Sequence, residues 1–482
     1  MRIYFPAIFF SFVILVCQFS AHDAVAQSES ANANNTVADQ AVIERIAVEI
    51  ESLLPNKYAE NSDEKKLVMQ IASALVERKT PVAIKLLDEL ALKDPSLPPK
   101  NLILAGISFA SNNPAQGRSL LERVGADFRE HPGVSLAFSR LALMQGRYFE
   151  AMTLAEKAGE LAQSQTFNEQ ARKYYAIEAF SSMTVIEMRR NDLNRAKGLV
   201  QKWAALAPSS NEMLLSAAEI EFREKQYSKS VELLDQRSDT DKQKLPTEIV
   251  MAKWYRSNSE FKSLGTWVAK AVEKYPDNPV VQLEHAAWLL RVGKYDEVEQ
   301  AIVVLEAKNG PSLDSLSIKG RVAFGRGNYD AAVDNFGQVY SQQPNNFENS
   351  SMYVFSLLET EGPQNKQQGV SLAQRNFQAF PNSQLAALAM SVALNKAGKA
   401  SLSNQLLERA ARMGNILPDT AFFMATKLNG EGRGLQAKIM LDTFMGAQDL
   451  FLYRERAQEL IDSIGSDESL PEPNAGSSGK EK

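Results

Sequence analysis

The chain has 482 residues, of which 44% are hydrophobic and 23% are charged, and its formal net charge at pH 7 is -5. These fractions are typical of a folded protein, and the mild negative charge argues against broad, non-specific binding to nucleic acid. A single cysteine, Cys17, excludes an internal disulfide framework and a thiolate metal site.

The first 26 residues have the composition of an export signal. Arg2 supplies a positive end, residues 3–17 are almost all apolar, and Ala24-Val25-Ala26 has the small residues of a cleavage site. The apolar stretch is too short to span a membrane as a helix. We therefore expect a signal peptide over residues 1–26 and a periplasmic or secreted mature chain. An uncleaved anchor, or lipidation of Cys17, would instead attach the chain to a membrane.

Two different segments follow the cleavage site. Residues 27–40 are polar and rich in Asn, Ala and Ser, which predicts a flexible linker. Residues 41–65 contain a predicted N-terminal helix, because Ile43, Ile46 and Ile50 recur at helical spacing.

From residue 191 to residue 329 the sequence repeats a pattern every 34 residues. Large side chains recur at Leu193, Tyr227, Phe261, Tyr295 and Tyr329. Small or weakly polar residues stand nine positions ahead of each, at Thr184, Ala218, Ala252, Ala286 and Gly320. A further compact set follows three positions after the large residues, at Ala196, Ser230, Leu264, Val298 and Ala332. A fixed period of this length indicates a tandem array of small structural units.

The units have the pattern of paired helices. Residues 331–340 place apolar side chains at spacings of four and three residues, which is typical of an amphipathic helix. Glycine marks the turn in the best copies, as at Gly293 and Gly327, and acidic residues follow it at Asp296 and Asp330. No stretch shows the sustained alternation of a strand. The sequence therefore predicts an all-α fold.

The pattern resembles the tetratricopeptide repeat (TPR) family. The strongest copies are Gly320 with Gly327-Asn328-Tyr329, Ala332 and Pro344, and Ala286 with Gly293-Lys294-Tyr295 and Val298. The resemblance implies a right-handed helical-repeat solenoid of antiparallel helix pairs, with about eleven TPR-like units over residues 66–446. Two irregular segments, 161–170 and 361–368, could bend the solenoid or divide it into two subarrays.

The C-terminal region is predicted to close the array. Leu450, Tyr453, Ala457 and Ile461 form an apolar stripe, so residues 447–465 are predicted to be a C-terminal capping helix. Residues 466–482 are rich in Ser, Gly, Pro and charge, which predicts a disordered tail.

The sequence offers no catalytic, cofactor-binding or metal-ligating pattern. After signal removal only His131 and His285 remain as histidines, and neither lies in a metal-binding motif. The glycine-rich run 430–434 falls at an expected repeat turn and follows no strand. We therefore predict a protein that is not an enzyme and binds no cofactor.

The TPR resemblance implies that the first helix of each unit lines a concave groove. At three positions per unit that commonly face a ligand, the sequence has eight bases against two acids, Glu219 and Glu361. The predicted partner-binding groove consists of Arg140, Met144, Arg189, Phe222, Arg223, Lys253, Arg256, Arg291, Arg321 and Phe324, with Lys396 as a further base. Guanidinium groups bind carboxylates in a bidentate fork, so we expect a protein or peptide partner with acidic segments.

The sequence leaves two functions open, and an enzyme is a third possibility only because a fold does not determine function. The first is an exported, non-catalytic scaffold that binds extended peptide segments in the Arg-lined groove. The alternative is an accessory module of an anionic exopolysaccharide assembly or secretion machine, because a basic lane also suits an acidic glycan. Solvated arginines without a ligand would give the same pattern.

Overall fold

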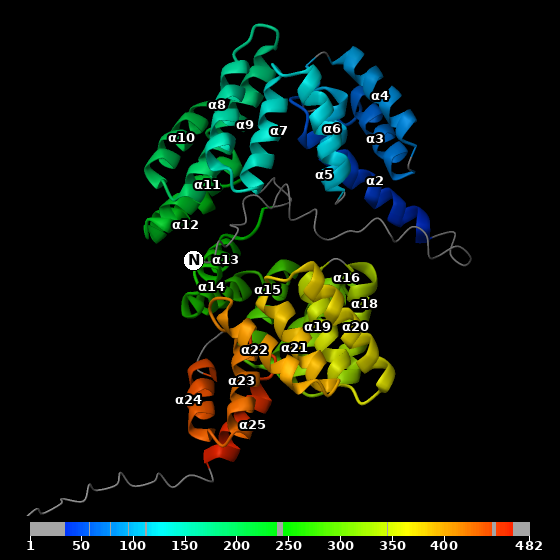
Figure 1. Ribbon diagram of the computed structural model, residues 1–482. Helices are drawn as coiled ribbons and strands as arrows, with labels where there is room; N and C mark the ends of the chain where they lie inside the picture. The colour runs from blue at the N-terminus through cyan, green and yellow to red at the C-terminus, as the bar shows by residue number, and fades with distance from the viewer. Residues whose placement is uncertain are drawn as a thin grey trace, which may run out of the picture. The chain divides into compact units, whose positions relative to one another are not determined.

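The chain folds into helices alone over the part that the structure describes. The computed structural model describes residues 34–465, except 57, 78, 95, 111–112, 239–243, 345 and 446–449. Within these residues there are 24 helices and no strand (Figure 1). None of the described helices is long and apolar enough to cross a membrane.

Two compact units make up the chain, unit 1 ending at Thr247 and unit 2 beginning at Glu248. Unit 1 contains α2 (Asn34–Ser52), then α3 (Asp63–Val76), α4 (Thr80–Lys93), α5 (Lys100–Ala110), α6 (Pro114–Asp127), α7 (Pro132–Met144), α8 (Tyr148–Leu161), α9 (Glu169–Arg190), α10 (Leu193–Leu206), α11 (Asn211–Arg223) and α12 (Tyr227–Asp235). Apart from the first residue of α13, unit 2 contains α13 (Thr247–Ser257), α14 (Phe261–Lys274), α15 (Pro279–Arg291), α16 (Tyr295–Asn309), α17 (Leu313–Gly325), α18 (Tyr329–Gln342), α19 (Phe347–Glu359), α20 (Pro363–Ala379), α21 (Gln384–Lys396), α22 (Ala400–Arg412), α23 (Pro418–Gly430), α24 (Gly434–Met445) and α25 (Arg454–Gly465).

The helices from α3 to α24 succeed one another as eleven pairs, and all of these except α13 and α14 pack closely together, which confirms the predicted helical-repeat architecture. We call the first helix of each pair the A helix and the second the B helix. The irregular segment at 161–170 precedes an A helix of 22 residues, α9. The division between the two units falls at neither irregular segment but before α13.

A left-handed residue makes the turn inside most pairs. Gly293 and Gly327 have φ values of 75° and 71°, as the sequence pattern requires. One repeat and two repeats before Gly293, Ser259 and Lys225 adopt the same left-handed conformation with φ values of 60° and 63°. The repeat imposes this conformation even where no glycine is present, at the cost of local strain.

The small residues lie where the two helices of a pair cross. Ala218, Ala252 and Ala286 are completely buried. At Gly320 a Cβ atom would stand 2.8 Å from the ring of Phe336, too close for the ring to stay in place. The hydroxyl of Ser230 donates a hydrogen bond of 2.9 Å to the carbonyl of Ala218 across one such crossing. The two helices of a pair cross closely at these positions. This explains why the small residues of the A helices and the compact residues of the B helices recur with the same period.

The two ends of the array differ from their predictions. Helix α2 begins at Asn34, within the segment predicted as a linker. Helix α25 packs on α24 as a cap does, but residues 450–453 do not belong to it and fold back onto other helices of unit 2. The predicted signal peptide, 1–26, and the predicted tail, 466–482, lie outside the described residues.

Candidate functional site

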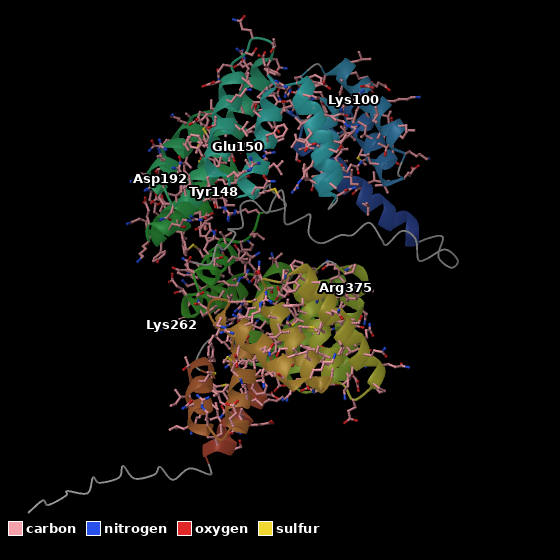
Figure 2. All side chains as sticks on the ribbon, in the orientation of Figure 1. Lys100, Tyr148, Glu150, Asp192, Lys262 and Arg375 are labelled. Carbon is pink, nitrogen blue, oxygen red and sulfur yellow. The ribbon has the colours of Figure 1, made fainter. Side chains whose placement is uncertain are left out.

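All ten residues of the predicted groove lie on A helices, from α7 to α17. We call the surface formed by the A helices of one unit its A-helix face. Charged side chains are not confined to this face, because Glu150, Lys262 and Arg375 lie exposed on B helices (Figure 2). A charge on an A helix is therefore not by itself a sign of binding.

In unit 1, three arginines of the predicted groove lie close to carboxylates. Arg140 on α7 pairs with Glu178 on α9, and the two side chains are 31% and 28% exposed. On α11, Nη2 of Arg223 lies 2.5 Å from Oε1 of Glu219, while its Nη1 donates to the carbonyl of Met188 at 2.8 Å. Burial lowers the pKa of Arg189 on α9, and the charge of Glu219 opposes this effect. Arg140 therefore joins α7 to α9, and Arg223 joins α11 to α9.

Glu219 is the most enclosed of these charges. Its side chain is 2% exposed, and burial raises its pKa against the opposing effect of Arg223 and Arg189. Its Oε2 accepts no hydrogen bond from any described residue. A buried carboxylate with one unsatisfied oxygen is costly, so Arg223 and Arg189 are needed to keep it in place.

In unit 2, most bases of the predicted groove also have carboxylate partners. Arg256 on α13 donates to Glu284 on α15 at 2.8 Å, and Lys253 lies 3.4 Å from the same carboxylate. Arg321 on α17 donates to Glu348 on α19 at 2.8 Å and is only 9% exposed. The guanidinium of Arg321 lowers the pKa of Glu348. Separately, Arg291 lies over the ring of Phe261 at 5.6 Å, and Lys396 lies 3.0 Å from Glu359.

The predicted groove is therefore not a row of isolated cations, because most of its bases lie beside carboxylates of the same unit. The count of charges at three positions per repeat did not include the acids at other A-helix positions, namely Glu178, Glu284, Glu348 and Glu359. A signal for three of them was present, because each lies 27 to 38 residues after the arginine that it binds. This separation is close to one repeat, so the pairs join each A helix to the next one.

The two phenylalanines of the predicted groove are core residues. Phe222 is 4% exposed and Phe324 is 3% exposed, which corrects their assignment to a ligand-facing surface. Their rings pack edge-on against Tyr227 at 5.4 Å and Tyr329 at 5.3 Å. Of the apolar members only Met144 is at the surface, with 54% of it exposed.

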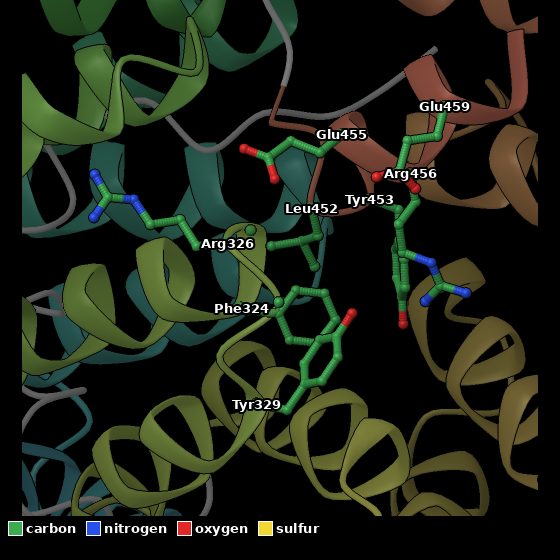
Figure 3. Close-up of a pocket in the computed structure, with 10 residues that line it drawn as sticks. Phe324, Arg326, Tyr329, Leu452, Tyr453, Glu455, Arg456 and Glu459 are labelled. Carbon is green, nitrogen blue, oxygen red and sulfur yellow. The ribbon is translucent and has the colours of Figure 1, made fainter. Parts of the chain in front are cut away.

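The segment that precedes α25 lies on the A-helix face of unit 2. Tyr453, which precedes α25, is 1% exposed and packs against Phe324 of α17 and Phe422 of α23, with ring centroids 5.1 and 5.2 Å apart. Figure 3 shows Tyr453 and Arg456 facing Phe324 and Tyr329. We call residues 450–456 the C-terminal strap. Sequence reasoning placed this region at the end of the array and did not identify its contacts with α17 and α19.

Helix α2 occupies a corresponding place in unit 1. It packs against the A helices α3 and α5, and Leu53, which follows its last residue, lies against Gly106 of α5. At its end, the carbonyl of Ser52 accepts a hydrogen bond of 3.3 Å from the hydroxyl of Tyr174 on α9. The A helices α7, α9 and α11 thus form the rest of the A-helix face of unit 1.

The histidines are packing residues. Nδ1 of His131 accepts a hydrogen bond of 3.1 Å from the backbone N–H of Gly133 and so caps the start of α7. Burial lowers the pKa of His131 to about 4 and also lowers that of His285. No group of three or more metal-ligating side chains occurs among the residues described.

No family model and no curated protein matches this chain. Among solved structures, a tetratricopeptide repeat protein from Parabacteroides merdae is 10% identical, over 69% of this chain and 97% of its own, with a TM-score of 0.30. PilF of Pseudomonas aeruginosa is 16% identical, over 48% of this chain and 97% of its own, with a TM-score of 0.28. The human IFIT1 dimer with PPP-AAAA is 14% identical, over 76% of this chain and 81% of its own, with a TM-score of 0.37. These TM-scores are too low to indicate what the chain binds.

Proposed function

We propose that the protein is an exported, non-catalytic scaffold that binds protein segments on the A-helix face of unit 1. The proposed site consists of Arg140, Met144, Arg189 and Arg223, on α7, α9 and α11. One observation supports this choice above the others: Met144 is 54% exposed one helical turn after Arg140, whereas in unit 2 the strap lies on the A helices α17, α19 and α23. Helical repeats commonly bind partners on such extended surfaces.

The chemistry of the site favours a segment that carries carboxylates. A guanidinium has five N–H donors, so an arginine that already binds one glutamate can bind a second carboxylate. Arg140 uses Nη2 for Glu178, and the exposed fractions of both side chains leave them within reach of solvent. An acidic partner would bind an Arg140 whose charge is already partly neutralised by Glu178. We therefore expect moderate affinity and strong salt dependence. Lys253, Arg256, Arg291, Arg321 and Phe324 are not part of this proposed site.

A photo-crosslinking amino acid at position 144 tests the proposal. In the native host, the protein with this substitution should crosslink to one or a few discrete proteins, and raised salt should weaken the capture. The matched control is the same substitution at Phe149, which is 87% exposed on the B helix α8 of the same unit. Equal crosslinking at both positions would disprove a specific A-helix site. Adducts with a polysaccharide in place of proteins would favour the exopolysaccharide alternative.

Export is a separate part of the proposal, supported by the small residues Ala24-Val25-Ala26 after a short apolar stretch. The protein isolated from its native host should begin at or near Gln27. N-terminal sequencing and intact-mass measurement check this start. A retained Met1, or a lipid on Cys17, would place the chain at a membrane instead.

A further inference from the structure

The C-terminal strap is bound to unit 2 by polar contacts that resemble recognition of a peptide. Oδ1 of Asp419, on α23, accepts the backbone N–H groups of Leu452 at 2.9 Å and Tyr453 at 3.2 Å. Asp419 is 7% exposed, so the strap backbone lies against a carboxylate that water scarcely reaches. Two successive backbone donors on one acceptor fix the direction and position of the strap.

A second buried carboxylate, that of Glu359, binds two side chains of the strap. The hydroxyl of Tyr453 donates to Oε1 of Glu359, on α19, at 3.3 Å. Nη1 of Arg456 lies 3.3 Å from the same oxygen, and the guanidinium stands over the ring of Phe422 at 5.5 Å. The side chain of Glu359 is 7% exposed. Tyrosine and arginine, three residues apart, thus meet one carboxylate and one aromatic surface.

The aromatic surface comes from A helices that are far apart in the sequence. Phe324 lies on α17, Phe355 on α19, and Phe422 and Phe423 on α23, and all four rings are within 6.3 Å of the Tyr453 ring, centroid to centroid. A cleft of about 240 Å³ remains beside the strap, lined by Phe324, Tyr329, Tyr453 and Arg456 among others (Figure 3). The strap therefore covers its site without filling it.

We propose that the A-helix face of unit 2 is a peptide-binding site with the strap as its resident ligand, and that a partner segment bearing Tyr-x-x-Arg enters by displacing the strap. The acceptors of the site support this occupant, because the Glu359 carboxylate meets a hydroxyl and a guanidinium while Oδ1 of Asp419 accepts two backbone N–H groups. The site differs in place and in charge preference from the one proposed on unit 1. If the protein with the crosslinker at position 144 captures no partner, the site proposed on unit 1 is wrong, but the site proposed on unit 2 is not affected.

Competition by the strap is strong because it is attached to its own site. The last described residue of α24, Met445, is separated from Leu450 by only four residues. A short connection holds a ligand at an effective concentration in the millimolar range. A free peptide at micromolar concentration should therefore enter the site poorly while this connection is intact, and readily once it is cut.

The test uses the full chain with a protease site inserted between residues 446 and 449. The probe is a fluorescent peptide with the sequence of residues 450–465, and its anisotropy reports binding. Cutting the connection should raise the apparent affinity of the chain for the probe about a hundredfold, because the resident segment is then diluted to the protein concentration. A probe with Arg456→Ala should bind about tenfold more weakly, since it loses the ion pair with Glu359. A probe with Tyr453→Ala should bind at least about a hundredfold more weakly, since it also loses the ring contacts with Phe324 and Phe422. The control probe carries Gln458→Ala, an exposed position whose side chain donates a hydrogen bond to Asp462 of the same helix.

Several results would overturn the inference. The cut segment could remain bound and never exchange with the probe, or unit 2 could lose its helical circular dichroism on cutting; either would make the strap a permanent part of the core. Equal binding of the native and Tyr453→Ala probes would remove the proposed specificity. Concentration-dependent dimers of the uncut chain, lost in an Arg456→Ala variant, would show that the occupant is the strap of a second copy. On the uncut chain, hydrogen exchange at Leu452 and Tyr453 should be faster than in α19, because the strap opens without unfolding its site.

Discussion

Raising the pH from 4 to 7 should lower the free energy of unfolding of unit 2 by as much as about 4 kcal/mol through Asp419 alone. Burial raises the pKa of this carboxyl from 3.8 to about 7, against the stabilising effect of two backbone N–H groups and of Arg321 and Arg454. Between these two values the folded chain keeps a proton that the unfolded chain has released. Stability due to Asp419 is therefore complete below pH 3.8 and is lost as the pH rises toward 7.

The variant Asp419→Asn isolates this effect. Its amide oxygen can still accept the N–H groups of Leu452 and Tyr453, but it cannot ionise. Urea unfolding of the native protein and the variant from pH 4 to pH 7.5 should give two curves that diverge, with the variant gaining relative stability as the pH rises. The control Asp442→Asn changes an exposed residue of α24 and should leave the pH dependence unaltered. Parallel curves for the native protein and Asp419→Asn would contradict the assignment.

Acid should have the opposite effect on unit 1. The ring of His131 lies edge-on to Phe167 and Tyr175, with ring centroids 5.5 Å away in each case, and burial lowers its pKa from 6.5 to about 4. Below pH 6.5 the unfolded chain binds a proton that the folded chain does not. The contribution of His131 to stability is complete above pH 6.5 and is lost between pH 6.5 and pH 4, by as much as about 3 kcal/mol.

Two substitutions separate the charge of His131 from its capping bond. His131→Asn preserves an N-cap acceptor for the N–H of Gly133 and removes the titration, so the unfolding free energy should fall less steeply between pH 7 and pH 4.5. His131→Ala removes both, and should add a loss of about 1 kcal/mol that does not depend on pH. Urea unfolding of both variants at four or five pH values provides the measurement. An unchanged acid dependence in His131→Asn would show that another group is responsible.

The repeat itself was accessible from the sequence because it depends on contacts between residues close in the chain. A helix pair needs a small residue at its crossing and a left-handed residue in its turn, and Ala286 and Gly293 show both requirements at fixed spacing. The same reasoning placed the A helices and hence the positions of the candidate arginines. It could not place their partners, because Glu178 and Glu348 come from the next A helix, and their distance from Arg140 and Arg321 depends on how successive pairs stack.

The sequence by itself therefore determined the helical class of this protein, the pairing of its helices and the turn chemistry within each pair. Only the tertiary structure decided which A-helix surfaces are covered. Tyr453 has the apolar spacing of a capping helix, yet its ring lies against Phe324, 129 positions earlier in the chain. Contacts of this kind depend on the accumulated rotation of several repeats, and that rotation leaves no periodic signal in the residues. The burial of Asp419 and Glu359 beneath the strap has the same origin, so neither carboxylate could be distinguished from a solvated one by sequence alone.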